Sequence, residues 1–161
     1  DVDRSRGLGD VYKRQELSSS EKNIAENLMI VDVLRNDISR VSKKGSVEVT
    51  ELAKIKSYKN VHHLVSTIKG SLSEKLDAID LLFATLPGGS ITGAPKIRAM
   101  EIISELEKNR RGVYCGAIGF ISFSKDSDFN IPIRTLTIAD DTISINCGGG
   151  IVSDSLSLIH I

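Results

Sequence analysis

The stretch that most constrains the fold of this chain is Pro87–Lys96, which reads Pro-Gly-Gly-Ser-Ile-Thr-Gly-Ala-Pro-Lys. Its three glycines permit backbone angles and close approaches that a side chain would block, and Pro95 suits the first turn of a helix. Apolar residues at helical spacing follow, so the pattern predicts a tight loop leading into a helix over about residues 95–107. Because such a helix start has unpaired N–H groups and a positive dipole end, the loop is a candidate cradle for a carboxylate or phosphate.

Two plainer interpretations stand beside the anion cradle. Gly88 and Gly93 have the separation of a P-loop, but Ala94 and Pro95 follow where that motif needs Lys and then Ser or Thr. The sequence therefore argues against nucleotide binding of that kind. The second interpretation, a glycine-rich connection between two helices with no ligand, stays open.

Composition and charge narrow the class of protein. With 161 residues, 40% of them hydrophobic, the chain is long enough for one soluble domain with a core. Lys and Arg number 21, as do Asp and Glu, so the net charge is zero and nothing predicts a nucleic acid partner. No apolar run approaches the length of a membrane span and no signal pattern opens the sequence, so we expect a cytoplasmic protein with no membrane partner. Cys115 and Cys147 lack metal-ligand spacing, and each is expected to be a reduced thiol buried in a strand.

The first half of the chain predicts a helix followed by a β-hairpin. Residues 1–15 show no periodicity and are expected to be an irregular leader. Ser18–Ser20 offer caps for a helix to about Arg35, which is apolar almost all round from Leu28 to Leu34 and is therefore expected to be covered on more than one side. A short strand at residues 47–49 follows, and then two β-like runs, 53–58 and 61–69, around a turn at Lys59-Asn60.

The second half adds helices and further strands. We predict a helix over residues 73–84 before the glycine loop, and strands over 113–123, 129–138 and 142–147 after it. The order of elements predicts an α+β fold with a mostly antiparallel sheet.

Polar residues in the apolar helix are the first candidates for function. Asp32, Arg35 and Asn36 share one helix face, which favours a structural network of ion pairs and hydrogen bonds. Glu26 has no obvious partner at helical spacing apart from Lys22. A lone carboxylate beside an apolar block is either in a salt bridge or a ligand.

Three further features point to an anionic ligand. His63 lies within a predicted strand, where a histidine is more often a structural residue than a catalyst. Arg134 is the only full charge in the middle of its strand, and Gly148–Gly150 follow another strand. Consecutive glycine N–H groups form an anion-binding nest, although a bulge or a flexible exit would also explain them. Together with Glu26 and the glycine loop, these residues suit a small dianion and a metal.

Five blocks of the sequence resemble the chorismate-utilising enzymes, in the order found there, over about residues 16–155. The blocks are Ala25–Asp37, Val61–Ser66, Pro87–Lys96, Ile133–Thr135 and Gly148–Ser155. The resemblance implies that residues 16–155 are part of a chorismate-binding domain with the fold of anthranilate synthase component I. Within the family, the loop Pro87–Lys96 is more similar to the aminodeoxychorismate synthase branch than to the anthranilate synthase branch.

The resemblance implies a reaction and partners. Chorismate and ammonia from a glutamine amidotransferase, present as a subunit or a fused domain, would give 4-amino-4-deoxychorismate, the precursor of p-aminobenzoate and folate. The alternatives are anthranilate, isochorismate or salicylate synthesis on the same scaffold, or a non-catalytic binding or assembly module.

The resemblance also implies roles for single residues. Glu26 matches a Mg²⁺ ligand, and His63, rather than His62, matches the histidine that faces the departing C4 hydroxyl. Positions near the ring carboxylate match Thr92 and Gly93. The cradle for the enolpyruvyl carboxylate matches Arg134 and the backbone of Gly148, Gly149 and Gly150.

The sequence departs from the family pattern in three places. Phe120 stands where relatives commonly have a Tyr that helps to hold the enolpyruvyl carboxylate. The family's Pro-Ile-Lys-Gly block and a catalytic Glu, expected upstream of residue 16, and its second pair of Mg²⁺-binding glutamates, expected after Ser155, are not found. We therefore expect an internal piece of a larger enzyme that turns over nothing as given, and we consider a non-native origin for residues 1–15 and 156–161.

Overall fold

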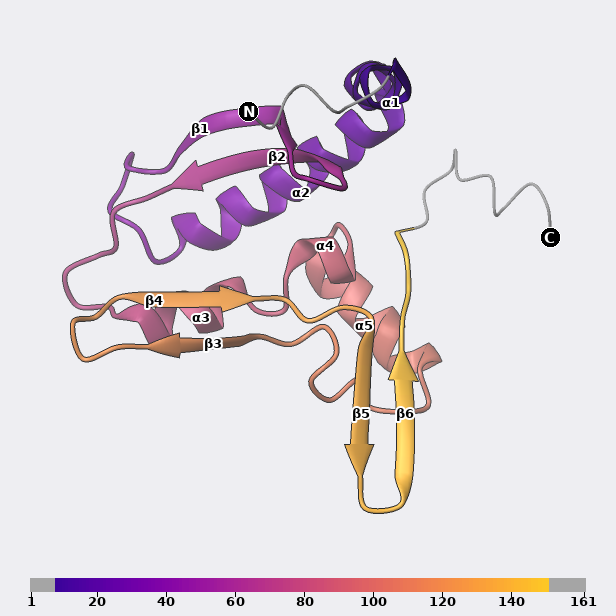
Figure 1. Ribbon diagram of the computed structural model, residues 1–161. Helices are drawn as coiled ribbons and strands as arrows, with labels where there is room; N and C mark the ends of the chain where they lie inside the picture. The colour runs from indigo at the N-terminus through magenta and orange to yellow at the C-terminus, as the bar shows by residue number, and fades with distance from the viewer. Residues whose placement is uncertain (1–7, 151–161) are drawn as a thin grey trace. The chain divides into compact units, whose positions relative to one another are not determined.

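The computed structural model describes residues 8–150 of a chain that divides into two compact units, residues 1–71 and 72–161. Both units combine helices with strands, and the sheets are three separate antiparallel pairs, β1 with β2, β3 with β4 and β5 with β6 (Figure 1). The prediction of an α+β fold with mostly antiparallel sheet is therefore confirmed.

Two helices open the first unit. The irregular leader predicted over residues 1–15 is wrong from Leu8 onwards, because α1 spans Leu8–Ser19, while residues 1–7 lie outside the described part. Good helix formers such as Lys13 and Arg14 and the acidic Asp10 in the first turn favour this helix. The predicted caps are confirmed for α2, Glu21–Ser39, whose N-cap Ser20 accepts a hydrogen bond from the backbone of Asn23 at 3.3 Å.

The β-hairpin of the first unit joins β1, Glu48–Ser57, to β2, His62–Lys69 (Figure 1). The predicted turn is confirmed, and Tyr58 closes it by donating its N–H to the carbonyl of Val61 at 2.8 Å. One strand replaces the two predicted over 47–49 and 53–58, since the backbone continues through a bulge at Ala53 with φ 47°. Asn27 of α2 holds the helix on the hairpin by donating to the carbonyl of Leu64 at 3.4 Å.

The apolar block of α2 is less covered than predicted. Within residues 28–34 only Val31 is buried, whereas Leu28 is 42% exposed. The predicted pair of Asp32 and Arg35 forms at 3.3 Å but lies at the surface of the unit. Asp37 is the buried polar residue of α2, and it pairs with Arg40 at 3.2 Å. In this unit the helix therefore buries only one side.

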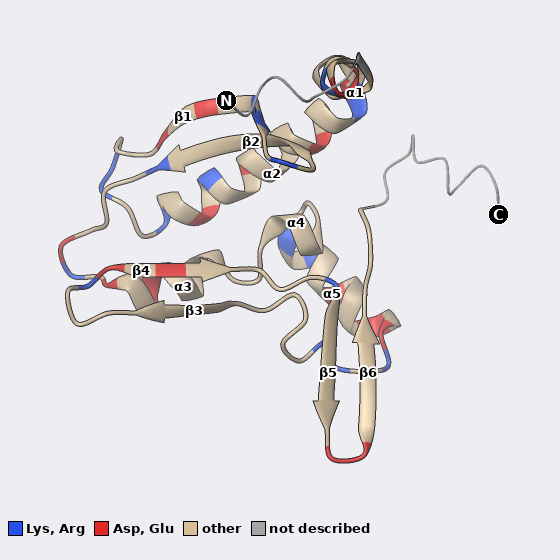
Figure 2. Cartoon of the chain, in the orientation of Figure 1, with Lys and Arg blue, Asp and Glu red and all other residues tan. Residues whose placement is uncertain are grey.

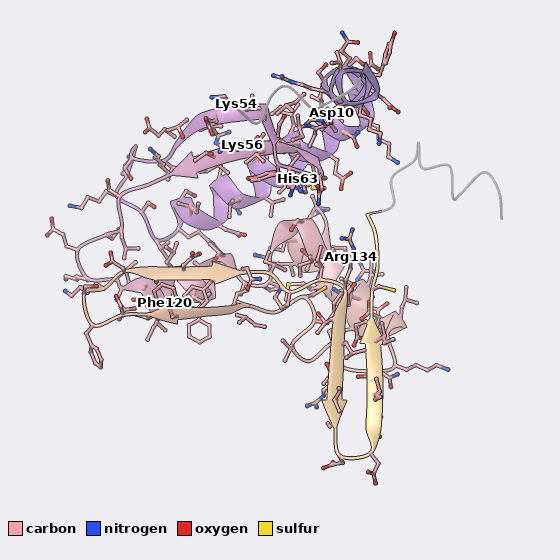
Figure 3. The ribbon with its side chains drawn as sticks, viewed as in Figure 1. Asp10, Lys54, Lys56, His63, Phe120 and Arg134 are labelled. Atoms are coloured by element: carbon pink, nitrogen blue, oxygen red, sulfur yellow. The ribbon has the colours of Figure 1, made fainter. Side chains whose placement is uncertain are left out.

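Glu51 on β1 is the centre of a charged cluster. Its carboxylate accepts from Lys54 at 2.8 Å, lies 3.0 Å from Lys56 and accepts from Thr67 of β2 at 3.1 Å. Figure 3 shows both lysines on β1. The hydrogen bond from Lys54, and after it those from Lys56 and Thr67, lower the pKa of Glu51 from 4.5 to about 2.

Replacing this carboxylate is expected to weaken the first unit in a pH-dependent way. A lowered pKa stabilises the folded state above pH 4.5, and this stabilisation is lost as the pH falls towards about 2. Glu51→Gln should therefore lower the urea midpoint of unfolding at pH 7, and the difference from wild type should shrink at pH 3. Glu48→Gln, on the same strand but exposed, is the matched control. If the difference in urea midpoint between wild type and Glu51→Gln is the same at pH 7 and pH 3, the stabilising role of the ionised Glu51 is wrong.

Three helices open the second unit. α3, Ala78–Thr85, begins later than the predicted residue 73 because Asp77 and Asp80 form a capping box there. The glycine loop contains a short helix that was not predicted, α4, Gly89–Thr92. α5 spans Lys96–Leu106 after the N-cap Pro95, so the predicted loop leading into a helix is confirmed.

Two hairpins complete the second unit. β3, Ile118–Ile121, pairs with β4, Ser127–Asn130, and β5, Thr135–Ala139, pairs with β6, Thr142–Asn146. The predicted strand over 113–123 is wrong outside residues 118–121. Before it, a turn forms around Cys115, with φ 63°, and after it β3 ends at Ile121. The predicted strand over 129–138 is divided, since Pro132 has no N–H for a strand ladder and Arg134 has φ 51°.

Both cysteine predictions need correction. Cys115 is buried as expected, but it lies in the turn rather than in a strand. Cys147 follows β6 and is exposed. Neither is part of a disulfide.

One face of the hairpin β5–β6 is an exposed apolar ladder. Leu136 pairs with Ile145 and Ile138 with Ile143 across the strands, and all four side chains are more than half exposed. In Figure 2 these strands carry no charged residue, and acidic residues lie only at their turn. Exposed apolar patches of this kind mark surfaces that pack against other protein.

Membrane-spanning helices are absent from the part of the chain that the structure describes: none of its helices has the length and apolar character needed.

Candidate functional site

The glycine loop uses most of its polar groups to hold itself together. The hydroxyl of Thr92 donates to the carbonyl of Gly88 at 2.9 Å, and the N–H of Gly93 donates to Gly89 at 3.0 Å. Gly93 has φ 129°, a region that side-chain-bearing residues rarely adopt. Lys96 donates from Nζ to the carbonyl of Thr85 at 3.1 Å, which closes the loop over its base.

The start of α5 is the open part of this loop. Pro95 provides no side-chain cap, so the first backbone N–H groups of α5 have no capping partner of that kind. Thr92 and Gly93 come directly before this turn. The anion cradle stays a prediction, and its donors would come from the first turn of α5, since the N–H of Gly93 already donates to Gly89.

Arg134 and the glycines at 148–150 lie at the same end of one hairpin. Thr135 is paired with Asn146, so Arg134, just before β5, is close to the residues just after β6. Figure 3 shows Arg134 at this end of β5. Its side chain is exposed and forms no hydrogen bond or ion pair with any residue from 8 to 150, and the glycines are exposed as well. The tertiary structure thus places a guanidinium with no partner in the described chain close to the glycine segment 148–150, which is called the glycine turn below.

The predicted residues of the first unit are Glu26 and His63. Glu26, on α2, is half-buried and has no hydrogen bond or ion pair with another described residue. His63, on β2, is exposed, and its ring meets the ring of Tyr58 edge-on at 5.7 Å. In contrast, His62 is engaged by Ser57 at 2.8 Å and Asp10 at 3.0 Å. His63 is thus the freer of the two imidazoles.

The predicted site residues are divided between the two units. Glu26 and His63 belong to the first unit, and no hydrogen bond or ion pair joins them there. The loop with Thr92 and Gly93, Arg134 and the glycine turn belong to the second unit.

The predicted residues do not form a complete metal site within residues 8–150. No cluster of three or more His, Cys, Asp or Glu side chains that could hold an ion occurs within residues 8–150. Glu26 fits as one hard oxygen ligand because its carboxylate is half-buried and unpaired within the described chain.

Three further residues lie near the predicted site residues in sequence or contact them. Phe120 was noted from the sequence, whereas Arg111 and Tyr114 were not proposed as site residues. Phe120, on β3, is 59% exposed and has no hydroxyl to offer (Figure 3). Arg111 donates to the carbonyl of Ile91 in the glycine loop at 3.0 Å, and it lies over the ring of Tyr114. The sequence signals only a local pair of Glu107 and Arg111 at i, i+4, so the contact with the loop, 20 residues away, could not be predicted.

Comparisons of both the sequence and the structure with known proteins point to one protein family. The profile of the family described as chorismate binding enzyme matches residues 3–157. Aminodeoxychorismate synthase component 1 of Escherichia coli (strain K12) is 58% identical over 140 residues, which cover 87% of this chain and 31% of that protein. Anthranilate synthase component 1 of Aquifex aeolicus is 51% identical over 142 residues, covering 88% of this chain and 29% of that protein.

A solved structure supports the same fold. The crystal structure of anthranilate synthase component I from Streptococcus pneumoniae TIGR4 is similar with a TM-score of 0.73 and 49% identity. The similarity covers 80% of this chain and 29% of that one. The chain spans about a third of the length of the curated relatives it matches. Because the family profile matches nearly the whole sequence and the fold agrees, the chain belongs to the family of chorismate binding enzymes.

Proposed function

We propose that the chain is part of an enzyme that aminates chorismate at C4, with ammonia from a glutamine amidotransferase, to give 4-amino-4-deoxychorismate. The observation that carries the proposal is the 58% identity with a relative named aminodeoxychorismate synthase component 1. The words "component 1" in that name support a second component. Amination at C2, which gives anthranilate, is the second candidate, because a relative named anthranilate synthase component 1 is 51% identical.

The second unit would hold the two carboxylates of chorismate. Arg134 and the N–H groups of Gly148–Gly150 lie at one end of a hairpin, where a guanidinium fork and a backbone nest together suit the enolpyruvyl carboxylate. The ring carboxylate would lie at the glycine loop, beside Thr92 and Gly93 and the uncapped first turn of α5. Two separate cradles would select a diacid over a monoacid.

Two residues of the chain, His63 and Glu26, are proposed to take part in the chemistry at C4. A protonated His63 would give its proton to the departing C4 hydroxyl as a general acid, and its exposed ring has room for that hydroxyl. Glu26 would hold Mg²⁺, which supplies positive charge for the ring carboxylate and for charge that develops in the reaction.

We further propose that this chain works as an internal part of a longer enzyme. It spans about a third of its relatives, it contributes a single candidate metal ligand within residues 8–150, and it exposes the apolar ladder of β5–β6. Each of these features is what a domain cut through its sheet would present.

The chain by itself is therefore expected to bind chorismate weakly and to release no product. The test is incubation with chorismate, ammonium and Mg²⁺, followed by chromatographic separation of 4-amino-4-deoxychorismate from anthranilate. The Escherichia coli relative named above, in the same assay, is the positive control. Turnover near that of the full-length relative would refute the hypothesis that the chain has only part of the catalytic site. Release of anthranilate would favour amination at C2.

A further inference from the structure

The turn between α5 and β3, residues 111–116, contacts the glycine loop, Gly148 and the segment that leads to Arg134. Arg111 is its first anchor. Its guanidinium donates from Nε to the carboxylate of Glu107 at 2.8 Å and from a second nitrogen to the same carboxylate. The remaining nitrogen, Nη1, donates to the carbonyl of Ile91 at 3.0 Å, one residue before Thr92. Because the fork is planar, the contact with Glu107 fixes the direction in which the third nitrogen reaches the glycine loop.

Tyr114 is the second anchor, and it reaches the glycine turn. The guanidinium carbon of Arg111 lies 5.9 Å from the centre of the Tyr114 ring, a cation–π distance. A Cβ built at Gly148 would lie only 2.7 Å from the Tyr114 hydroxyl oxygen. The hydroxyl therefore occupies the space that a side chain at position 148 would need, and the glycine there permits this close approach.

The backbone of the same turn holds the segment that leads to Arg134. Cys115 adopts φ 63° and donates its N–H to the carbonyl of Pro132 at 2.8 Å. Among residues 72–150, Cys115 is also the one buried residue, with 7% of its surface exposed. Pro132 is two residues before Arg134, so the turn anchors the backbone that leads to Arg134.

We infer that Arg111 and Tyr114 are positioning residues that hold the glycine loop and the glycine turn at a set separation, matched to the two carboxylates of one substrate molecule. The inference deepens the proposed function and rests on it for the identity of the diacid. Neither residue needs to touch the substrate. Arg111 acts through the carbonyl of Ile91, and Tyr114 acts through its contact with Gly148.

The first test needs no ligand and uses the full chain. Backbone amide resonances are compared by ¹H–¹⁵N NMR in wild type, Arg111→Gln, Tyr114→Phe and the control Arg110→Gln, whose side chain is exposed. Arg111→Gln should shift the amide signals of Thr92, Gly93 and Gly148. Of these three signals, Tyr114→Phe should shift only that of Gly148. If Arg111→Gln shifts these signals no more than the control does, the positioning role is wrong. Tyr114→Phe removes a single oxygen and keeps the test valid even if Arg111→Gln unfolds the unit.

The second test measures chorismate binding by equilibrium dialysis with the same variants. Loss of one charged hydrogen-bond donor predicts affinity weaker by about tenfold for Arg111→Gln. Arg111→Lys should recover only part of it, since an ammonium cannot reproduce the fork. If wild type does not bind chorismate, the proposed function fails for this chain while the NMR comparison still decides the positioning role. Unchanged affinity in Arg111→Gln, with wild-type binding intact, would overturn the inference.

Discussion

Gly119→Ala should cost more stability than any other single substitution considered for this chain. A Cβ at this position of β3 would overlap the carbonyl oxygen of Asp128 on β4 and lie 2.5 Å from the ring of Phe129. The clash is with backbone, which cannot move without breaking the pairing of Gly119 with Phe129. Overpacking typically costs 1–3 kcal/mol, and we expect about 3 kcal/mol or more here, seen as a lower urea midpoint.

The control for this substitution is another glycine with open space around it. Apart from its chain neighbours, no residue of the described range 8–150 has an atom within 4 Å of a Cβ built at Gly149, so Gly149→Ala should leave the urea midpoint close to wild type. Cross-strand NMR contacts between β3 and β4 should disappear in Gly119→Ala and persist in Gly149→Ala. A Gly119→Ala protein with the wild-type midpoint would show that the hairpin is not packed as described.

Arg134→Gln should cause the largest loss of chorismate binding. The guanidinium of Arg134 has no partner within residues 8–150 and lies beside the glycine turn, so a carboxylate there would gain charge-assisted hydrogen bonds. Removing such bonds costs about 1.5–3 kcal/mol, which is roughly 10- to 100-fold in affinity. Equilibrium dialysis with chorismate, at fixed salt, measures the change.

Arg110→Gln is the matched control for this loss as well. Like Arg134→Gln, it removes one positive charge from the second unit. The control therefore corrects for the general loss of attraction between the unit and a dianion. If the affinity of Arg134→Gln for chorismate is within twofold of that of the control, Arg134 is not part of the proposed site. Because Arg134 has φ 51° and glutamine would have to adopt the same angle, the comparison of urea midpoints separates a lost contact from a changed backbone.

Local patterns were sufficient wherever neighbouring residues decide the backbone. The caps at Ser20, the turn at residues 59–60 and the passage from the glycine loop into α5 at Lys96 all follow from side-chain and backbone preferences within a few positions. The strand β2 follows in the same way from its β-like run, whereas the bulge that makes one strand of β1 does not.

Local patterns failed where a distant contact decides the backbone. Residues 113–117 are apolar and β-like, yet they turn because Cys115 bonds to Pro132, 17 positions away. The helix over residues 8–15 was missed for a different reason: this stretch has few apolar residues and several charges, although many of its residues are good helix formers. Apolar content alone cannot distinguish a buried turn from a buried strand.

The sequence by itself determined the family resemblance, the α+β class and the residue types of the two cradles proposed for carboxylates, because short motifs carry backbone geometry and charge directly. Only the tertiary structure decided that Arg134 lies beside the glycine turn, and that Arg111 and Tyr114 connect this turn with the glycine loop. The physical reason is that hairpin register and the reach of a guanidinium fork depend on contacts between residues far apart in the chain, and spacing along the sequence does not record them.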